Sequence, residues 1–273
     1  MLKIRYRIEK GGLGMEKKEI LEELLTWRYA HRGFHKKPTV PENSMTAFRR
    51  AVAEGFGIEL DVHLTTDKKL AVIHDSSLRR TCGADLNIEE ITLGEAQVYF
   101  LEKSEEVIPA FEDVLEAVSG RVPLIIEIKT AGGNHKELTD AVMYALEGYD
   151  GLYCIESFDP SVVGHLRKNY PAVIRGQLAG CLNKNFDKKN AGSSGSEPTL
   201  TGLQDFLLKN LWVNFEGRPD FVAYCCEDRD MRAFVNFRGA KFLWTIRSYD
   251  DLKACEKSGA AGIFEQFNPK DYE

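Results

Sequence analysis

The chain has 273 residues, a formal net charge of −6, and 43% hydrophobic and 29% charged residues. This length suits one large domain, such as an α/β barrel. The acidic balance and the lack of a Lys/Arg-rich block argue against nucleic acid as a partner. No run approaches the ~18 apolar residues that span a bilayer, and the N-terminus lacks an apolar signal core. We therefore expect a cytoplasmic protein with no stable membrane association.

The cysteines are scattered along the chain, and the only close pair is adjacent in sequence. They show neither a C-x-x-C spacing typical of zinc sites nor the dense framework of a small secreted domain. We expect free thiols in a reducing compartment at Cys82, Cys154, Cys181, Cys225, Cys226 and Cys255.

The N-terminal part of the chain predicts a flexible leader followed by a helix. Residues 1–14 form the leader, and a single domain is expected to occupy residues 15–273. The helix, MEKKEILEELLTW, carries one apolar face formed by Ile20, Leu21, Leu24 and Leu25. Such a helix could close the bottom of a barrel.

The next segment reads as strand, loop, helix and strand. Residues 27–30 form a short strand that ends in His31-Arg32-Gly33, and Asn43 or Ser44 is a natural N-cap for the helix that follows. Gly55 ends that helix immediately before a strand at residues 57–64. A βαβ unit of this kind makes the two strands parallel neighbours, so their C-terminal ends lie side by side.

The strand at residues 57–64 carries two acids, Glu59 and Asp61. Because they are two residues apart, both side chains point to one face of the strand. Their mutual repulsion requires water, a cation or a basic side chain nearby, unless the strand is an edge strand with solvated acids. A second strand-like run, LAVIH, ends in His74 and Asp75.

The rest of the chain alternates between strands and helices. An insertion of about residues 63–109 precedes a helix at 110–118 and an apolar strand at 123–129, which bears Glu127 and Lys129 near its end. Residues 181–202 form a long polar loop rich in Gly and Ser. This alternation predicts a TIM (β/α)₈ barrel. Its eight strands are expected near positions 28, 58, 124, 152, 173, 221, 242 and 262.

The polar residues at the predicted strand ends share the rim where (β/α)₈ barrels build their active sites. Three carboxylates make a hard-oxygen site suited to Mg²⁺ or Ca²⁺, and two basic side chains suit a phosphate. A pair of imidazoles is typical of general acid and base catalysis near neutral pH. Together they indicate phosphodiester cleavage, and the residues are His31, Arg32, Glu59, Asp61, His74, Glu127 and Lys129.

The segments AHRGFHKKPTVPENSMTAF, IELDVHLTTDKKLAVIHD and IIEIK together resemble the glycerophosphodiester phosphodiesterase family. The resemblance implies a TIM barrel with a small insertion after the second strand. It implies that Glu59, Asp61 and Glu127 hold a divalent metal, that His31 and His74 are the acid/base pair, and that Arg32 and Lys129 lie at the phosphate. The implied reaction hydrolyses a small glycerophosphodiester to glycerol 3-phosphate and an alcohol, through a cyclic phosphate that water then opens. It belongs to lipid and glycerol metabolism.

The second half of the chain departs from that family's pattern at two predicted strand ends. Arg247 follows Trp244-Thr245-Ile246 where such proteins commonly have Asn, and Glu265-Gln266 replaces a Thr-Asp pair. We expect Trp244 to line the substrate pocket, with Phe158 as a second aromatic candidate whose role is closer to core packing.

Two alternatives remain open from the sequence. One is an enzyme of the lysophospholipase D or sphingomyelinase D kind, although the polar composition of residues 181–202 does not favour a membrane-facing lip. The other is a barrel that binds a phosphorylated metabolite without turning it over. Neither the choice between Mg²⁺ and Ca²⁺ nor the oligomeric state follows from the sequence.

Overall fold

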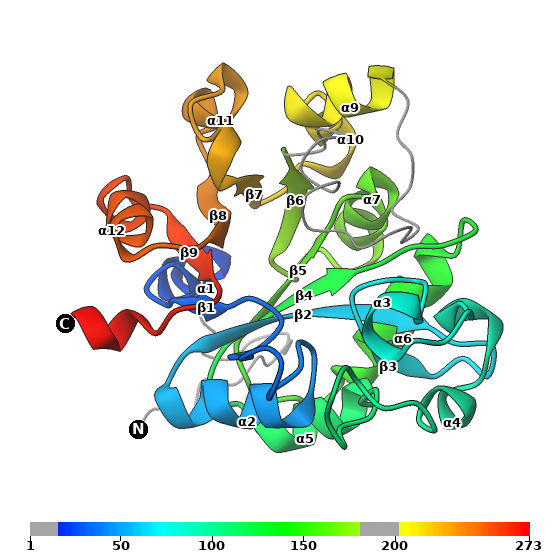
Figure 1. Cartoon of the computed structure of the whole chain (residues 1–273). Coiled ribbons are helices and arrows are strands. Elements are labelled where there is room, and N and C mark those ends of the chain that lie inside the picture. Colours follow the sequence, from blue (N-terminus) through cyan, green and yellow to red (C-terminus); the bar gives the residue numbers. More distant parts are fainter. Residues whose placement is uncertain (1–15, 181–201) are drawn as a thin grey trace.

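A closed barrel of eight parallel strands organises the molecule (Figure 1). The computed structural model describes residues 16–180 and 202–273. The predicted leader, residues 1–14, and nearly all of the predicted loop 181–202 lie outside the described residues. Strand β1 pairs with both β2 and β9, which closes the barrel and confirms the predicted (β/α)₈ fold. The barrel strands are β1 Tyr29–Ala30, β2 Gly57–Leu64, β4 Leu124–Ile128, β5 Tyr153–Ser157, β6 Arg175–Ala179, β7 Phe221–Cys225, β8 Ala240–Ile246 and β9 Ala261–Phe264.

Helices follow most of these strands and pack around the barrel (Figure 1). The segment before β7 forms two short helices, because Leu211 adopts a positive φ of 57° and separates them. No helix in the described part of the chain is long and apolar enough to cross a membrane. The helices are α1 Lys17–Leu24, α2 Met45–Glu54, α3 Arg79–Cys82, α4 Leu93–Ala96, α5 Phe111–Val118, α6 His135–Ala145, α7 Pro160–Asn169, α9 Gly202–Lys209, α10 Asn214–Gly217, α11 Arg232–Asn236 and α12 Tyr249–Lys257.

The interior of the barrel is filled with apolar side chains, and α1 packs against them. Ile20 and Leu24 of α1 belong to the same buried cluster as Tyr29, Phe221 and Phe242 of the strands. The Tyr29 hydroxyl donates a hydrogen bond of 2.8 Å to the Leu24 carbonyl oxygen, which ties the first strand to this helix. The packing of α1 agrees with the role predicted for the N-terminal helix.

Strand β2 is buried on both faces, and its two faces have different chemistry. Ile58, Leu60 and Val62 join the outer core between the barrel and its helices. Because side chains alternate along a strand, Glu59 and Asp61 point the other way, toward the barrel axis. The strand thus has an apolar face toward the helices and an acidic face inside the barrel.

The segment between β2 and α5 lies beside the barrel and has its own small core (Figure 1). It begins with β3, Leu70–Val72, which runs antiparallel to β2 with Val62 opposite Val72. Buried Ile73, Leu78, Ile88 and Ile108 hold the segment together. By pairing with β2, β3 returns the chain to the rim of the barrel, directly before His74.

One cysteine differs from the expectation of free thiols. Cys225, at the end of β7, is disulfide-bonded. The cysteines that are free are Cys82, Cys154, Cys226 and Cys255. The spacing of the cysteines favoured free thiols, but spacing does not show which cysteines the fold brings together.

Helix α2 depends on a buried cap, and this gives a stability prediction. Ser44 Oγ accepts the Ala47 backbone N–H at 3.2 Å and donates to the Pro41 carbonyl oxygen at 2.8 Å. We expect Ser44→Ala to lower the free energy of unfolding by about 1–2 kcal/mol in urea titrations followed by circular dichroism. Thr92→Ala, at the exposed cap of the four-residue α4, is the matched control and should cost less. Equal losses in the free energy of unfolding would show that the buried cap stabilises the protein no more than the exposed one.

Candidate functional site

Three buried carboxylates meet inside the barrel near its C-terminal rim. Glu59 and Asp61 come from β2 and Glu127 from β4, where Asp61 and Glu127 are direct neighbours across the ladder. One oxygen from each side chain lies within 4.8 Å of the others. The parallel register explains this, since residues side by side on adjacent parallel strands point to the same face.

Hydrogen bonds and one ammonium group surround the three carboxylates. Lys129 Nζ lies 2.8 Å from Glu127 Oε1 and 3.3 Å from Asp61 Oδ1. Asn43 Nδ2 donates to Asp61 Oδ2 at 2.8 Å, and the Arg32 backbone N–H donates to Glu59 Oε2 at 2.8 Å. Each acid is therefore held in a fixed orientation.

The pKa values of the three acids are shifted in different directions. Burial and the charges of Asp61 and Glu127 raise the pKa of Glu59 well above its ordinary value. Burial, opposed by Lys129, raises the pKa of Glu127 to about 8. Although burial would raise the pKa of Asp61, the charges of Lys129, His74 and Arg32 hold it below its usual range. The protein's own cations therefore do not neutralise all three acids, and a further positive charge would be stabilised between them.

The donor set fits a hard divalent cation. All three ligands would be carboxylate oxygens, which Mg²⁺ and Ca²⁺ prefer, and no thiol or imidazole belongs to this cluster in the described residues. Asp61 Oδ1 is buried, and in the described structure it has the ion pair with Lys129 Nζ at 3.3 Å but no well-formed hydrogen bond. A bound cation would complete the pairing of this buried carboxylate oxygen.

The turn after β1 carries the first basic group into the site. Arg32 and Gly33 both have positive φ angles, 54° and 78°. A side chain at Gly33 would place its Cβ 2.9 Å from the Ala47 Cβ, so the tight turn needs glycine both for its backbone and for space. The Arg32 guanidinium lies between Glu42 Oε1, at 2.7 Å from Nη1, and Asp61 Oδ2, at 3.7 Å from Nε.

His31 links the carboxylate cluster to the last barrel strand. Its Nε2 lies 3.9 Å from Glu59 Oε2, and its Nδ1 lies 2.7 Å from Glu265 Oε2. Burial and the nearby Arg32 charge lower the pKa of His31, which favours the neutral imidazole. A neutral ring can exchange a proton at the nitrogen that faces the cluster.

His74 also has a carboxylate at its Nδ1. Its Nδ1 lies 2.6 Å from Asp75 Oδ1, and Arg80 Nε donates to the second oxygen of Asp75. Burial and the charges of Arg32 and Lys129 lower the pKa of His74 to about 3. Both predicted catalytic histidines are therefore neutral rings, each with a carboxylate at Nδ1.

Glu42 connects the basic groups of the rim, and sequence reasoning did not single it out. Its side chain contacts Arg32, Arg80 and Lys37, with Lys37 Nζ 2.6 Å from Oε2. Although burial would raise its pKa, these three cations hold the pKa of Glu42 well below its ordinary value. The ionised Glu42 orients Arg32 and also supports the arginine beside Asp75.

Two further acids on the rim were not recognised as site residues from the sequence. Glu156 of β5 lies next to Glu127 in the ladder, is buried, and has an Oε2 without a hydrogen-bond partner in the described structure. Burial and the charges of Glu127 and Asp61 raise its pKa well above the ordinary value. Glu265 was noted only as an unusual residue. The available signal was the same for both: an acid at or just beyond the C-terminal end of a barrel strand.

Seven of the eight predicted site residues lie in this connected network, and Trp244 takes a different position. Its ring is half-buried and packs edge-to-face against Phe158 with centroids 5.7 Å apart. Both aromatic rings contact the interior cluster. The indole Nε1 of Trp244 is buried and has no acceptor among the described residues, so it could donate a hydrogen bond to a bound molecule. His35 is buried, with Nε2 3.8 Å from Glu265 Oε2.

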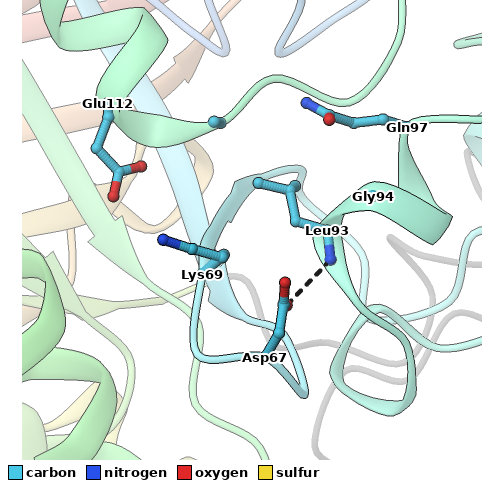
Figure 2. Close-up of a pocket in the computed structure, with 7 residues that line it drawn as sticks. Asp67, Lys69, Leu93, Gly94, Gln97 and Glu112 are labelled. Atoms are coloured by element: carbon cyan, nitrogen blue, oxygen red, sulfur yellow. Dashed lines mark hydrogen bonds between the residues drawn. The ribbon is translucent and has the colours of Figure 1, made fainter.

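A separate pocket lies outside the barrel and contains none of these groups (Figure 2). It has a volume of about 410 Å³. Figure 2 shows Asp67 accepting the backbone N–H of Leu93, at 3.1 Å, which joins the turn after β2 to α4. The lining residues are Asp67, Lys69, Leu93, Gly94, Gln97, Ala110 and Glu112. This outer pocket is open and has no paired catalytic groups among its lining residues. The carboxylate cluster is therefore the better candidate for chemistry.

The chain is similar to proteins of one known family. Residues 31–267 match the model of the glycerophosphoryl diester phosphodiesterase family. A glycerophosphodiester phosphodiesterase of Caldanaerobacter subterraneus is 30% identical over 245 residues, covering 86% of this chain and 91% of the relative. One from Bacillus altitudinis is 46% identical over 112 residues, covering 38% of this chain and 45% of the relative.

Solved structures show the same fold. An Oleispira antarctica phosphodiesterase, in complex with the product sn-glycerol-3-phosphate, superposes with a TM-score of 0.73 at 18% identity. The match covers 92% of this chain and 96% of that one. At this identity the likeness concerns the fold.

Proposed function

The chain belongs to the glycerophosphoryl diester phosphodiesterase family, and from that premise we propose that it hydrolyses glycerophosphodiesters to glycerol 3-phosphate and an alcohol. Glu59, Asp61 and Glu127 would hold a divalent cation, Mg²⁺ or Ca²⁺. His31 and His74 would transfer the protons. The observation that carries the proposal is the buried three-carboxylate cluster with two imidazoles beside it, His31 and His74, each held by a carboxylate at Nδ1.

The two histidines suit a reaction in two steps. In the first, the glycerol hydroxyl forms a bond to phosphorus and the bond to the alcohol oxygen breaks. One imidazole, as the neutral ring, takes the hydroxyl proton. The other must enter this step as an imidazolium, with protons on both nitrogens, to supply a proton to the departing alcohol. In the second, water opens the cyclic phosphate and the roles reverse, so that both rings return to their starting states.

The basic residues of the rim suit the phosphate. Arg32 and Lys129 lie against the carboxylates, with Arg32 Nε 3.7 Å and Lys129 Nζ 3.3 Å from Asp61. A phosphate entering here would meet both cations at short range and gain charge-assisted hydrogen bonds. When bound, a divalent cation would add Lewis-acid stabilisation of negative charge on the phosphoryl group.

The substrate class is tested by an enzyme-coupled assay for glycerol 3-phosphate. We expect glycerol 3-phosphate to be released from glycerophosphocholine, glycerophosphoethanolamine and glycerophosphoglycerol. The three rates would show which alcohol group the pocket accepts best. A lysophospholipid is the comparison substrate, with free head-group alcohol as the readout, since a lysophospholipase D would prefer it. Turnover of the lysophospholipid alone would replace the proposed substrate class.

The cytoplasmic location expected from the sequence stays a prediction. Disulfides are rare in reducing compartments, so the disulfide at Cys225 is the observation that speaks against it. Cell fractionation with a thiol-trapping reagent would report both the compartment and the redox state of this cysteine.

A further inference from the structure

The C-terminal ends of three adjacent strands bring together a histidine, a carboxylate and an arginine. In the ladder, Ala30 of β1 lies opposite Phe264 of β9, and the His31 backbone N–H donates to the Phe264 carbonyl oxygen at 2.9 Å. On the other side, the Glu265 backbone N–H donates to the Ile246 carbonyl oxygen at 3.0 Å. The next residue of each strand therefore falls in one row: His31, Glu265 and Arg247.

The side chains of this row are joined through both oxygens of the central acid. Glu265 Oε2 lies 2.7 Å from His31 Nδ1, and Glu265 Oε1 accepts from Arg247 Nε at 2.8 Å. His35 Nε2 is the other imidazole nitrogen near this acid, at 3.8 Å. The Glu265 side chain is 9% exposed, so its contact with His31 is largely sheltered from water, whereas the Arg247 side chain is 34% exposed.

The chemistry of the three groups fixes the tautomer of His31. An ionised carboxylate only accepts hydrogen bonds, so the 2.7 Å contact requires the proton on Nδ1. In the neutral ring the lone pair then lies on Nε2, the nitrogen that faces Glu59 at 3.9 Å. Arg247 keeps the carboxylate ionised and in place, because its planar guanidinium stays charged and directs Nε at Oε1.

We propose that Glu265 is the positioning carboxylate of His31 and that Arg247 holds Glu265 in place, so that the three residues work as one unit. The inference rests on the proposed function for its effect on catalysis. Glu265 itself touches no reacting atom in this scheme and acts through the imidazole. This assigns a role to the two strand ends that depart from the family's usual sequence.

The first test is a double-mutant cycle on glycerol 3-phosphate release. Glu265→Gln should lower kcat by about tenfold or more while KM changes by less than about threefold, since the orientation of the His31 ring is lost and substrate contacts are kept. In a His31→Ala background the same substitution should change kcat by less than about twofold. An equal loss in both backgrounds would overturn the proposal, because Glu265 would then act independently of His31.

A matched control distinguishes loss of the Glu265–His31 bond from loss of a negative charge near Arg247. Glu227 Oε1 lies 3.7 Å from Arg247 Nη1 and is half-exposed. Glu227→Gln should leave kcat unchanged, because the acid that it removes does not contact the imidazole. A loss in kcat as large as that of Glu265→Gln would show that the charge around Arg247, and not the bond to His31, is what matters.

The second test needs no turnover and so distinguishes failure of the inference from failure of the proposed function. Nitrogen-15 NMR of histidine-labelled protein reports the tautomer of each neutral ring, and His31→Ala identifies its signals. The wild type should show His31 with its proton on Nδ1, and Glu265→Gln should shift the ring toward the other tautomer. A His31 ring protonated at Nε2 in the wild type, or unaffected by the substitution, would overturn the proposal even in a fully active enzyme. Absence of glycerol 3-phosphate release with the expected tautomer would overturn the proposed function alone.

Discussion

Replacing either His31 or His74 by alanine is expected to lower kcat for glycerophosphodiester hydrolysis by about 10²–10⁴-fold. Both rings are largely buried, neutral imidazoles beside the carboxylate cluster, each 14% exposed and oriented by an acid at Nδ1. Removing one ring leaves either the attacking hydroxyl or the departing alcohol without a partner for its proton. The measurement is steady-state release of glycerol 3-phosphate at saturating metal and substrate.

The control for this prediction is a histidine of the outer helices. His165 of α7 contacts Asp140 at 2.7 Å, outside the network of the rim. His165→Ala should retain the wild-type kcat, and circular dichroism should show all three variants folded. If His31→Ala or His74→Ala also kept the wild-type rate, that residue would have no part in proton transfer.

The second large effect is expected at the carboxylate cluster. Glu59→Gln should weaken divalent metal binding by at least about tenfold, since even residues that only support metal ligands commonly cost about 10–100-fold when removed. Glutamine keeps the size of the side chain and an oxygen for the Arg32 backbone N–H, so the loss isolates the negative charge. Isothermal titration with Mg²⁺ and Ca²⁺ measures the affinity directly, without any substrate.

A carboxylate outside the barrel gives the matched comparison. Glu112 lines the outer pocket, apart from the cluster, and Glu112→Gln should bind metal as the wild type does. The titration would also rank Mg²⁺ against Ca²⁺. Wild-type affinity in Glu59→Gln would contradict its assignment as a ligand and would require another residue, with Glu156 the nearest unused acid in the ladder.

The sequence predicted the barrel well because its strands are buried and clearly bordered. Residues 57–64 were predicted as a strand and form β2 with the same bounds, and the strand predicted at 123–129 is β4 at Leu124–Ile128. Strands buried on both faces carry a strong apolar signal, so their few acids stand out. That contrast is why Glu59, Asp61 and Glu127 could be singled out.

The supporting network could not be predicted in the same way, because it depends on contacts between distant segments. Glu265 is an unusual residue in the sequence, but its contact with His31 exists only because β9 pairs with β1 when the barrel closes. Glu156 lies in a short strand, and it is next to Glu127 because of the register between β4 and β5. Glu42 joins basic groups from two loops. Pairwise distances of this kind are fixed by tertiary structure and leave no periodic pattern.

The central claim is that this barrel hydrolyses glycerophosphodiesters with a divalent cation at the three carboxylates. The most direct measurement is release of glycerol 3-phosphate from glycerophosphoethanolamine by wild-type protein before chelation, after EDTA, and after restoring Mg²⁺ or Ca²⁺. We predict release at the start, none with EDTA, and recovery with at least one of the two metals. Undiminished release in the presence of EDTA would contradict the metal-dependent mechanism, and no release under any condition would contradict the substrate.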